Sequence, residues 1–234
     1  MKLGILGAME MEVESLLGLL EDKNTACHAG TAFHEGRLEG LDVVVVQCGI
    51  GKVNAALCVQ MLCDFYGVTY LVNTGIAGSL DAALDIGDLV ISVDAMYHDA
   101  DVTNFGYVPG QMAGMPVSFA ADPQLAEYAF AAAEEVNPGH TRRGRIASGD
   151  QFVCVQSLKD RIIEITGAAC TEMEGAAIAQ AAYRNGVPFV IIRAISDKAD
   201  NSAELDYPTF ERIAAHRCAA VTRAFAGMLK ESVG

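Results

Sequence analysis

The sequence predicts an α/β protein: a single domain, residues 1–234, with a central, mixed and mostly parallel β-sheet flanked by helices. Two observations predict this class. Short apolar, β-branched runs alternate with longer segments of helical spacing, which is typical of βαβ units. In addition, 52% of the 234 residues are apolar, and no repeat, low-complexity tract or Pro/Gly/Ser linker divides them, so one large core is expected.

The expected elements follow from this alternation. The apolar runs have the composition of strands that are buried on both faces, and the segments between them have apolar residues at helical spacing. In chain order we expect a strand at 3–6, a helix at 12–20, a strand at 43–46, a helix at 53–65, strands at 70–72 and 89–93, helices at 124–136 and 173–183, a strand at 189–192 and a helix at 210–229.

Local signals support two helix boundaries. Asp122 and Pro123 supply an N-cap and a first-turn proline for the third predicted helix, and Gly186 ends the fourth. The longest stretch without a predicted element is 96–119. A loop of this length in a compact domain is usually a lid or an interface.

The charge balance excludes two classes of partner. The chain has 16 basic and 30 acidic residues and a formal net charge of −14, and residues 53–141 hold eleven Asp and Glu but no Lys or Arg. Nucleic acids and anionic membrane surfaces both bind through clustered Lys and Arg, so neither is expected as a partner. A phosphate site would have to take its cations from elsewhere in the chain.

The N-terminus and the cysteines predict a cytoplasmic protein. The first residues form a short apolar strand without the longer apolar stretch of a signal peptide, and no uncharged run reaches the ~18–20 apolar residues of a membrane span. The seven cysteines are scattered and form no CxxC pair. This is typical of buried thiols in a reducing compartment rather than of a disulfide or zinc framework.

Three segments that contain glycine are predicted to be turns that follow strands. The segment 7–12 does not match the dinucleotide fingerprint, and 49–52 lacks the spacing of a phosphate loop. The segment 73–78 is predicted to be a second Gly-rich turn. Ligands of open α/β sheets bind at the carboxyl ends of strands, so these turns together predict one cleft.

No metal or other cofactor is expected. His98 with Asp99 and Asp101 resembles part of a metal site, but no second His lies nearby in the sequence. The two carboxylates can instead hold the imidazole and order the loop.

Three carboxylates are the candidate chemical groups. Glu12 follows the first strand, Glu174 precedes a predicted helix and Asp197 follows the apolar run at 189–192. If they converge, a cleft with few cations suits a substrate that becomes cationic in the transition state, as the sugar does in glycosidic cleavage. One carboxyl group would be protonated to assist the departing base and a second ionised to activate water, while the third accepts hydrogen bonds from a ribose diol.

Seven motifs follow one another along the chain: GAMEMEV at 7–13, GIGKV at 49–53, NTGIAG at 73–78, YHDADVT at 97–103, SGDQF at 148–152, EME at 172–174 and RAISD at 193–197. In this order, they closely resemble the motifs of the 5′-methylthioadenosine/S-adenosylhomocysteine nucleosidases, from residue 1 to about residue 230. The resemblance implies the nucleoside phosphorylase/hydrolase fold and hydrolysis of the N-glycosidic bond of these nucleosides. The alternatives are an aminofutalosine hydrolase and a purine nucleoside phosphorylase.

The resemblance also implies the catalytic roles. Glu12 is the base that positions the attacking water, Asp197 is the acid that protonates adenine at N7, and Ser196 orients Asp197. Glu174 holds the ribose hydroxyls, and Arg193 helps to order Glu12, Glu174 and the water.

The substrate-binding residues are implied by the same motifs. Phe152 stacks on adenine, the backbone of Val153 reads the edge of the base, Met173 packs beside the sugar and Tyr207 covers the 5′ group. The remaining implied contacts come from Ala8, Met9, Ile50, Ile76 and Glu172.

The family is dimeric, and the resemblance implies that the stretch 96–119 reaches the other subunit. Val102 and Phe105 would line the 5′ pocket of the neighbouring site. Position 76 is Ile where many members have Ser, which removes a hydroxyl near the water and the ribose, and position 113 is Ala where Pro is frequent, which gives a looser 5′ pocket. Because the same enzyme group also includes aminofutalosine hydrolases, the preferred 5′ substituent stays open. Because 73–78 has no arginine and Glu12 would repel an anion, water is favoured over phosphate as the nucleophile.

Overall fold

The computed structural model describes residues 1–232, apart from the side chain of Leu205. All the predicted strands and helices are present, several with shifted ends, and further elements lie between them. In order, the described elements are β1 (Leu3–Gly7), α1 (Glu10–Leu19), β2 (Glu21–His28), β3 (Thr31–Leu38), β4 (Leu41–Gln47), α2 (Lys52–Tyr66), β5 (Tyr70–Ser79), β6 (Leu89–Tyr97), a 3₁₀ turn (Thr103–Phe105), β7 (Phe119–Ala120), α3 (Pro123–Val136), β8 (Thr141–Ser148), α4 (Gln156–Thr166), β9 (Cys170–Glu172), α5 (Gly175–Asn185), β10 (Phe189–Asp197) and α6 (Ala203–Glu231).

The strands form one sheet that is partly closed. Its order is β10-β6-β8-β9-β5-β1-β4-β3-β2, with β7 paired to β6 and an additional pairing of β10 with β5. Because β10 pairs with both β6 and β5, the strands β5, β10, β6, β8 and β9 form a ring, and β1, β4, β3 and β2 extend from it. The pairings β4–β1, β1–β5 and β5–β10 are parallel and β10–β6 is antiparallel, which confirms the predicted mixed sheet.

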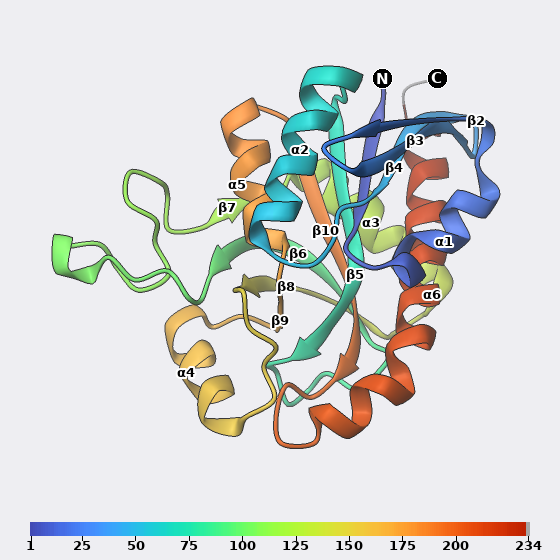
Figure 1. Ribbon diagram of the computed structural model, residues 1–234. Helices are drawn as coiled ribbons and strands as arrows, with labels where there is room; N and C mark the ends of the chain where they lie inside the picture. The colour runs from blue at the N-terminus through green and yellow to red at the C-terminus, as the bar shows by residue number, and fades with distance from the viewer. Residues whose placement is uncertain (233–234) are drawn as a thin grey trace.

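Helices cover both faces of this sheet (Figure 1). On one face, α2 and α5 pack over a core that includes Leu62 and Ile178. On the other face, α1, α3 and α6 pack over a core that includes Leu16 and Phe225. None of the described helices is long and apolar enough to cross a membrane.

The segment 73–78 was predicted to be a turn, and this prediction is wrong. The segment continues β5, pairs with β10 in parallel and is buried along its whole length. At Gly75, a Cβ atom would meet Glu12 and Arg193, and at Gly78 it would also meet a neighbouring side chain. The glycines therefore indicate close approach of other residues to a strand, rather than a turn.

Two further element ends differ from the prediction. The strand predicted at 189–192 continues to Asp197, so Arg193 lies inside β10 instead of beyond it. The last helix begins at Ala203, and it includes Pro208 in its second turn. The predicted start after this proline is wrong because a proline near the beginning of a helix is tolerated more easily than one in its middle.

The sequence patterns missed β2, β3, β7, β8, β9 and α4. β2 is exposed along almost its whole length and β8 begins with Thr-Arg-Arg, so neither has the apolar run of a buried strand. β7 and β9 have two and three residues, too few for a periodic pattern. In α4, Leu158 and Ile162 stand at helical spacing, which was a usable signal.

The long stretch without predicted structure is confirmed as a loop between β6 and β7, with one 3₁₀ turn. It extends away from the body of the molecule (Figure 1). Phe105, Val108 and Met112 in this loop are exposed apolar side chains.

Candidate active site

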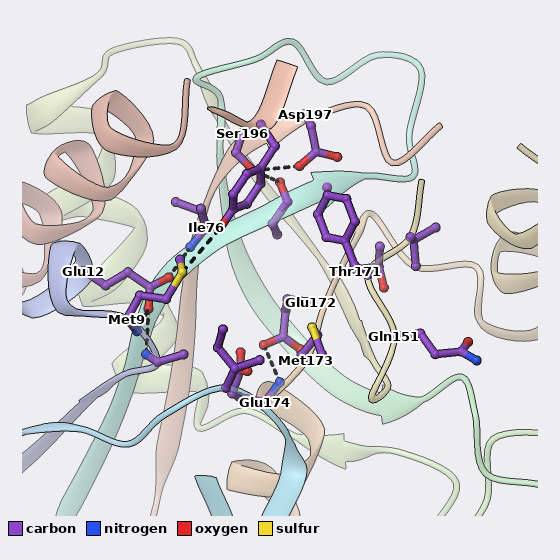
Figure 2. A pocket seen from close by; sticks show the side chains of 17 residues that line it. Met9, Glu12, Ile76, Gln151, Thr171, Glu172, Met173, Glu174, Ser196 and Asp197 are labelled. Atoms are coloured by element: carbon purple, nitrogen blue, oxygen red, sulfur yellow. Dashed lines mark hydrogen bonds between the residues drawn. The ribbon is translucent and has the colours of Figure 1, made fainter. Parts of the chain in front are cut away.

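A pocket lies at the carboxyl ends of β1, β5 and β10 (Figure 2). The segments before α1 and α2, the loop after β8, the β9–α5 junction and α6 complete its wall. The lining residues are Ala8, Met9, Glu12, Ile50, Ile76, Ala77, Gly78, Gln151, Phe152, Val153, Thr171, Glu172, Met173, Glu174, Ser196, Asp197 and Tyr207.

Glu12 lies in the first turn of α1, and its side chain is held by three backbone N–H groups. Oε2 accepts hydrogen bonds from Ala8 (2.6 Å) and Met9 (2.9 Å), and Oε1 accepts one from Ile76 (3.0 Å). The residue is only 3% exposed. Burial raises the pKa of Glu12, although the charge of Arg193 and the backbone N–H groups oppose this. Glu12 is thus a fixed carboxyl group that can hold a proton more readily than an exposed one.

Glu172 and Arg193 form a buried ion pair behind the pocket wall. The carboxylate of Glu172 also accepts hydrogen bonds from the Ser148 hydroxyl and from the backbone N–H groups of Glu174 and Gly175. The helix α5 begins at Gly175, and the carboxylate of Glu172 satisfies the first free backbone N–H of this helix.

Glu174 extends into the pocket from the junction before α5. Its Oε1 accepts a hydrogen bond from the backbone N–H of Gly51 (2.8 Å), in the turn that precedes α2. Burial and the nearby negative charge of Glu172 raise the pKa of Glu174, and Arg193 opposes them.

Asp197 is the last residue of β10 and is 2% exposed. Its Oδ2 accepts a hydrogen bond from the Ser196 hydroxyl (2.8 Å), and its Oδ1 accepts one from the backbone N–H of Ala199 (2.8 Å). Burial raises the pKa of Asp197, and these two hydrogen bonds lower it less than burial raises it. The side chain is therefore both held in one orientation and easier to protonate than an exposed aspartate.

Aromatic and sulfur-containing side chains form the apolar part of the wall. The rings of Phe152 and Tyr207 meet edge to face, with centroids 5.4 Å apart. The Tyr207 hydroxyl donates a hydrogen bond to Sδ of Met9 (3.3 Å). Phe152 remains 46% exposed, so one face of its ring is available to a planar ligand.

The pocket brings together the residues singled out in the sequence, with three exceptions. Arg193 lies behind the pocket and contacts it through Glu172. Val102 and Phe105 lie in the β6–β7 loop, and Phe105 is 81% exposed. Within one chain, these two residues are not part of the pocket.

The sequence did not single out four lining residues. Each is one or two residues from one that it did, so closeness along a strand or loop was the available signal. They are Ala77, Gly78, Gln151 and Thr171.

The charges of the pocket favour chemistry on a group that becomes positive. Of the described residues that line it, none is Lys or Arg, and the carboxyl groups of Glu12, Glu174 and Asp197 point into it from different sides (Figure 2). Raised pKa values allow one carboxyl group to carry a proton while another is ionised. Within residues 1–232, no group of three or more His, Cys, Asp and Glu side chains is arranged to hold a metal ion.

Comparisons with known proteins agree with this geometry. The model of the phosphorylase superfamily matches residues 2–227. A 5′-methylthioadenosine/S-adenosylhomocysteine nucleosidase from Shewanella loihica is 42% identical over 220 residues, which are 94% of this chain and 96% of that protein.

Solved structures show the same fold. The nucleosidase of that name from Colwellia psychrerythraea, in complex with adenine, has a TM-score of 0.95 and 41% identity, covering 98% of this chain and 96% of that one. A futalosine hydrolase from Helicobacter pylori has a TM-score of 0.92 and 31% identity, covering 97% of both chains.

Proposed function

The chain belongs to the phosphorylase superfamily, and from this membership we propose what its pocket does. It hydrolyses the N-glycosidic bond of 5′-methylthioadenosine and of S-adenosylhomocysteine. The products are adenine and 5-methylthioribose or S-ribosylhomocysteine. The observation that carries this proposal is the convergence of Glu12, Glu174 and Asp197 on a pocket whose described lining has no Lys or Arg.

The bond is broken with one acid and one base. Protonated Asp197, oriented by Ser196, donates its proton to N7 of adenine as the bond between N9 and C1′ breaks and its electron pair moves onto the purine. Glu12 takes a proton from a water molecule whose oxygen bonds to C1′. The raised pKa of Asp197 supports the acid role, and the three N–H groups that hold Glu12 support a fixed base.

Glu174 accepts hydrogen bonds from the ribose hydroxyls, and these strengthen as positive charge develops on the sugar. Met173 packs beside the ribose. Arg193 helps to order Glu12, Glu174 and the water; its ion pair with Glu172 supports this role, because it anchors the guanidinium directly behind the carboxylates.

The remaining wall recognises the base and the 5′ group. Phe152 stacks on adenine through its exposed face, the backbone of Val153 reads the edge of the base, and Tyr207 covers the 5′ substituent. These roles are supported by the edge-to-face contact between the two rings. Further contacts come from Ala8, Met9, Ile50, Ile76 and Glu172.

Water, and not phosphate, is the nucleophile. A phosphate ion needs Arg or Lys donors, and the described residues that line the pocket include neither. Glu12 occupies the place from which the nucleophile is activated, and its negative charge repels an anion. No cofactor or metal takes part in the reaction as proposed.

The active unit is a homodimer, in which each chain acts as one domain from residue 1 to 234. The β6–β7 loop reaches the other subunit, so Val102 and Phe105 complete the 5′ pocket there. Support comes from exposed apolar residues that one chain leaves uncovered, including Phe105 (81% exposed) and Val53 of α2 (70% exposed). The seven cysteines form no disulfide, which supports a cytoplasmic location.

Aminofutalosine hydrolysis is the second candidate. The similarity to the Helicobacter pylori futalosine hydrolase favours it. A purine nucleoside phosphorylase is the third.

The decisive experiment measures adenine release from 5′-methylthioadenosine with and without phosphate. We expect equal rates, and strict dependence on phosphate would contradict hydrolysis. A panel with S-adenosylhomocysteine and aminofutalosine at one pH then ranks the substrates. A kcat/KM for aminofutalosine far above the other two would favour the second candidate.

A further inference from the structure

Two segments that carry pocket residues, and the β6–β7 loop, meet at one lysine. Lys52 is the first residue of α2 and follows the turn that holds Ile50. Asp99 begins the β6–β7 loop, and Asp150 lies in the loop after β8, two residues before Phe152. The three side chains thus belong to three separate parts of the pocket wall or its surroundings.

Lys52, Asp99 and Asp150 are joined by four contacts. The Lys52 ammonium group donates a hydrogen bond to Oδ2 of Asp99 (2.6 Å) and lies 3.5 Å from Oδ2 of Asp150. The backbone N–H of Lys52 donates to Oδ1 of Asp150 (2.9 Å), and the backbone N–H of Asp150 donates to Oδ2 of Asp99 (2.9 Å). The ammonium group also lies over the ring of Tyr97, 5.3 Å from its centroid.

This network is linked directly to the pocket. Gly51, immediately before Lys52, is the residue whose N–H donates to Glu174, and its φ of 98° keeps the turn in a conformation that favours glycine. The side chains of Lys52 and Asp99 are 24% and 18% exposed, so water screens their attraction less than that of an exposed pair.

We propose that Lys52 is a positioning residue for the reaction. Its ammonium group, bound between Asp99 and Asp150, fixes the wall that carries Phe152 relative to the turn that holds Glu174. This inference rests on the proposed function for the roles of Phe152 and Glu174.

Nothing in the neighbouring sequence can replace this cation. Residues 53–141, which include Asp99, contain no Lys or Arg. Burial alone would raise the pKa of Asp99, but the hydrogen bonds from Lys52 and from the Asp150 N–H outweigh burial and lower it. Without the ammonium group of Lys52, the two carboxylates would be held only by backbone N–H groups, and their repulsion would loosen the contact between the loop after β8 and the turn.

The test compares Lys52→Met with Lys52→Arg, and it uses Lys2→Met as the control. Lys2 also forms an ion pair, but its partner Glu35 lies in β3, which carries no residue of the pocket. The measurements are kcat and KM for 5′-methylthioadenosine, the Kd of adenine by calorimetry, and Tm.

Lys52→Met should weaken adenine binding and lower kcat/KM, each by roughly 10-fold or more, the usual effect of losing a hydrogen bond to a charged group. Lys52→Arg should keep the adenine affinity and kcat/KM within about 3-fold of the wild-type values, because it keeps the charge. Lys2→Met should leave both unchanged. A structural role alone would lower Tm but leave the Kd and KM of the folded protein at the wild-type values.

Wild-type Kd and KM in Lys52→Met would overturn the proposal, and so would equal losses in Lys52→Met and Lys52→Arg. If the wild-type protein released no adenine at all, the proposed function would fail instead. The adenine affinities of the variants would still decide the role of Lys52.

Discussion

Gly75 of β5 leaves open the space in which the Glu12 carboxyl group lies. A Cβ atom at position 75 would be 2.9 Å from Cδ of Glu12 and 2.9 Å from Nη1 of Arg193, closer than Cβ atoms approach other heavy atoms in proteins. The proposed base and the arginine behind it therefore fit only because the neighbouring strand has no side chain at this point.

Gly75→Ala is expected to lower kcat by about 100-fold or more, because the methyl group displaces Glu12 from its N–H donors and a misplaced base loses the usual contribution of proton transfer. Adenine release in single-turnover conditions measures this. The control is Gly18→Ala in α1, where an added Cβ meets nothing within 4 Å. A normal kcat in Gly75→Ala would show that Glu12 is not the base of the reaction.

Asp197→Asn is expected to lower kcat by roughly 10² to 10⁴, the range for loss of a general acid, with a smaller change in KM. Asn can accept the same hydrogen bond from Ser196 but has no acidic proton to give to N7. Steady-state kinetics with 5′-methylthioadenosine measure the effect. Asp160→Asn, at an exposed carboxylate of α4 outside the pocket, is the matched control and should stay near wild type. Comparable losses in both variants would argue against a specific acid at 197.

Glu174→Gln is expected to be more stable than the wild type at alkaline pH. The pKa of Glu174 is raised from 4.5 to about 8 by burial and by Glu172. The folded protein therefore keeps a proton that the unfolded chain has lost. The resulting stability is complete below the unfolded pKa and disappears as the pH rises through about 8.

The amide of the Glu174→Gln variant has no such proton, so the Tm of the variant should rise relative to the wild type between about pH 5 and about pH 9. Each kcal/mol corresponds to roughly 2–4 °C for a chain of this size. Thermal unfolding at a series of pH values measures the difference. Glu10→Gln, which makes the same substitution at an exposed position in α1, is the control. A Tm difference in Glu174→Gln that is constant with pH would contradict the raised pKa.

The predictable contacts of the site are those between residues that are close together in the chain. Ser196 bonds to its neighbour Asp197, and Glu172 caps the turn that carries Glu174, so short motifs contain both relationships. The contact of Glu12 with Ile76 joins helix α1 to strand β5 and has no local pattern. This contact depends on the pairing of β1 with β5. The pairing was not predicted, because the segment 73–78 of β5 was predicted to be a turn.

The fold was predictable where strands are buried on both faces, as in β1, β4 and β10. The closure of the ring was not, because it depends on β8 and β9. β8 opens with charged residues and β9 has only three residues, so neither has a hydrophobic period to detect.

Arg193→Met is expected to lower the free energy of unfolding by about 3–5 kcal/mol, since it leaves the buried Glu172 carboxylate without its cation. The two side chains are 2% and 3% exposed. Adding Glu172→Gln should recover part of the loss. Urea unfolding at neutral pH measures both variants. Arg37→Met, which breaks an exposed pair with Asp22, should cost about 1 kcal/mol or less. An equally small cost for Arg193→Met would mean that the buried pair contributes no more than the exposed one.

Phe105 is expected to act in the site of the neighbouring subunit. It is 81% exposed and lies in the β6–β7 loop, outside the pocket of its own chain. Phe105→Ser should raise the KM for 5′-methylthioadenosine by roughly 10-fold, because burial of a Phe side chain is worth about 1.5–3 kcal/mol. The variant should leave the affinity for adenine, which lacks a 5′ group, unchanged.

Mixing two variants decides which chain Phe105 serves. In a heterodimer of Phe105→Ser with Asp197→Asn, the site of the first chain has its own Asp197 and receives Phe105 from the second. After unfolding and refolding together in equal amounts, about a quarter of all sites should therefore regain the wild-type KM. If Phe105 acted within its own chain, no site in the mixture would combine both side chains. The mixture would then show only the kinetics of the two separate variants, which would contradict a shared site.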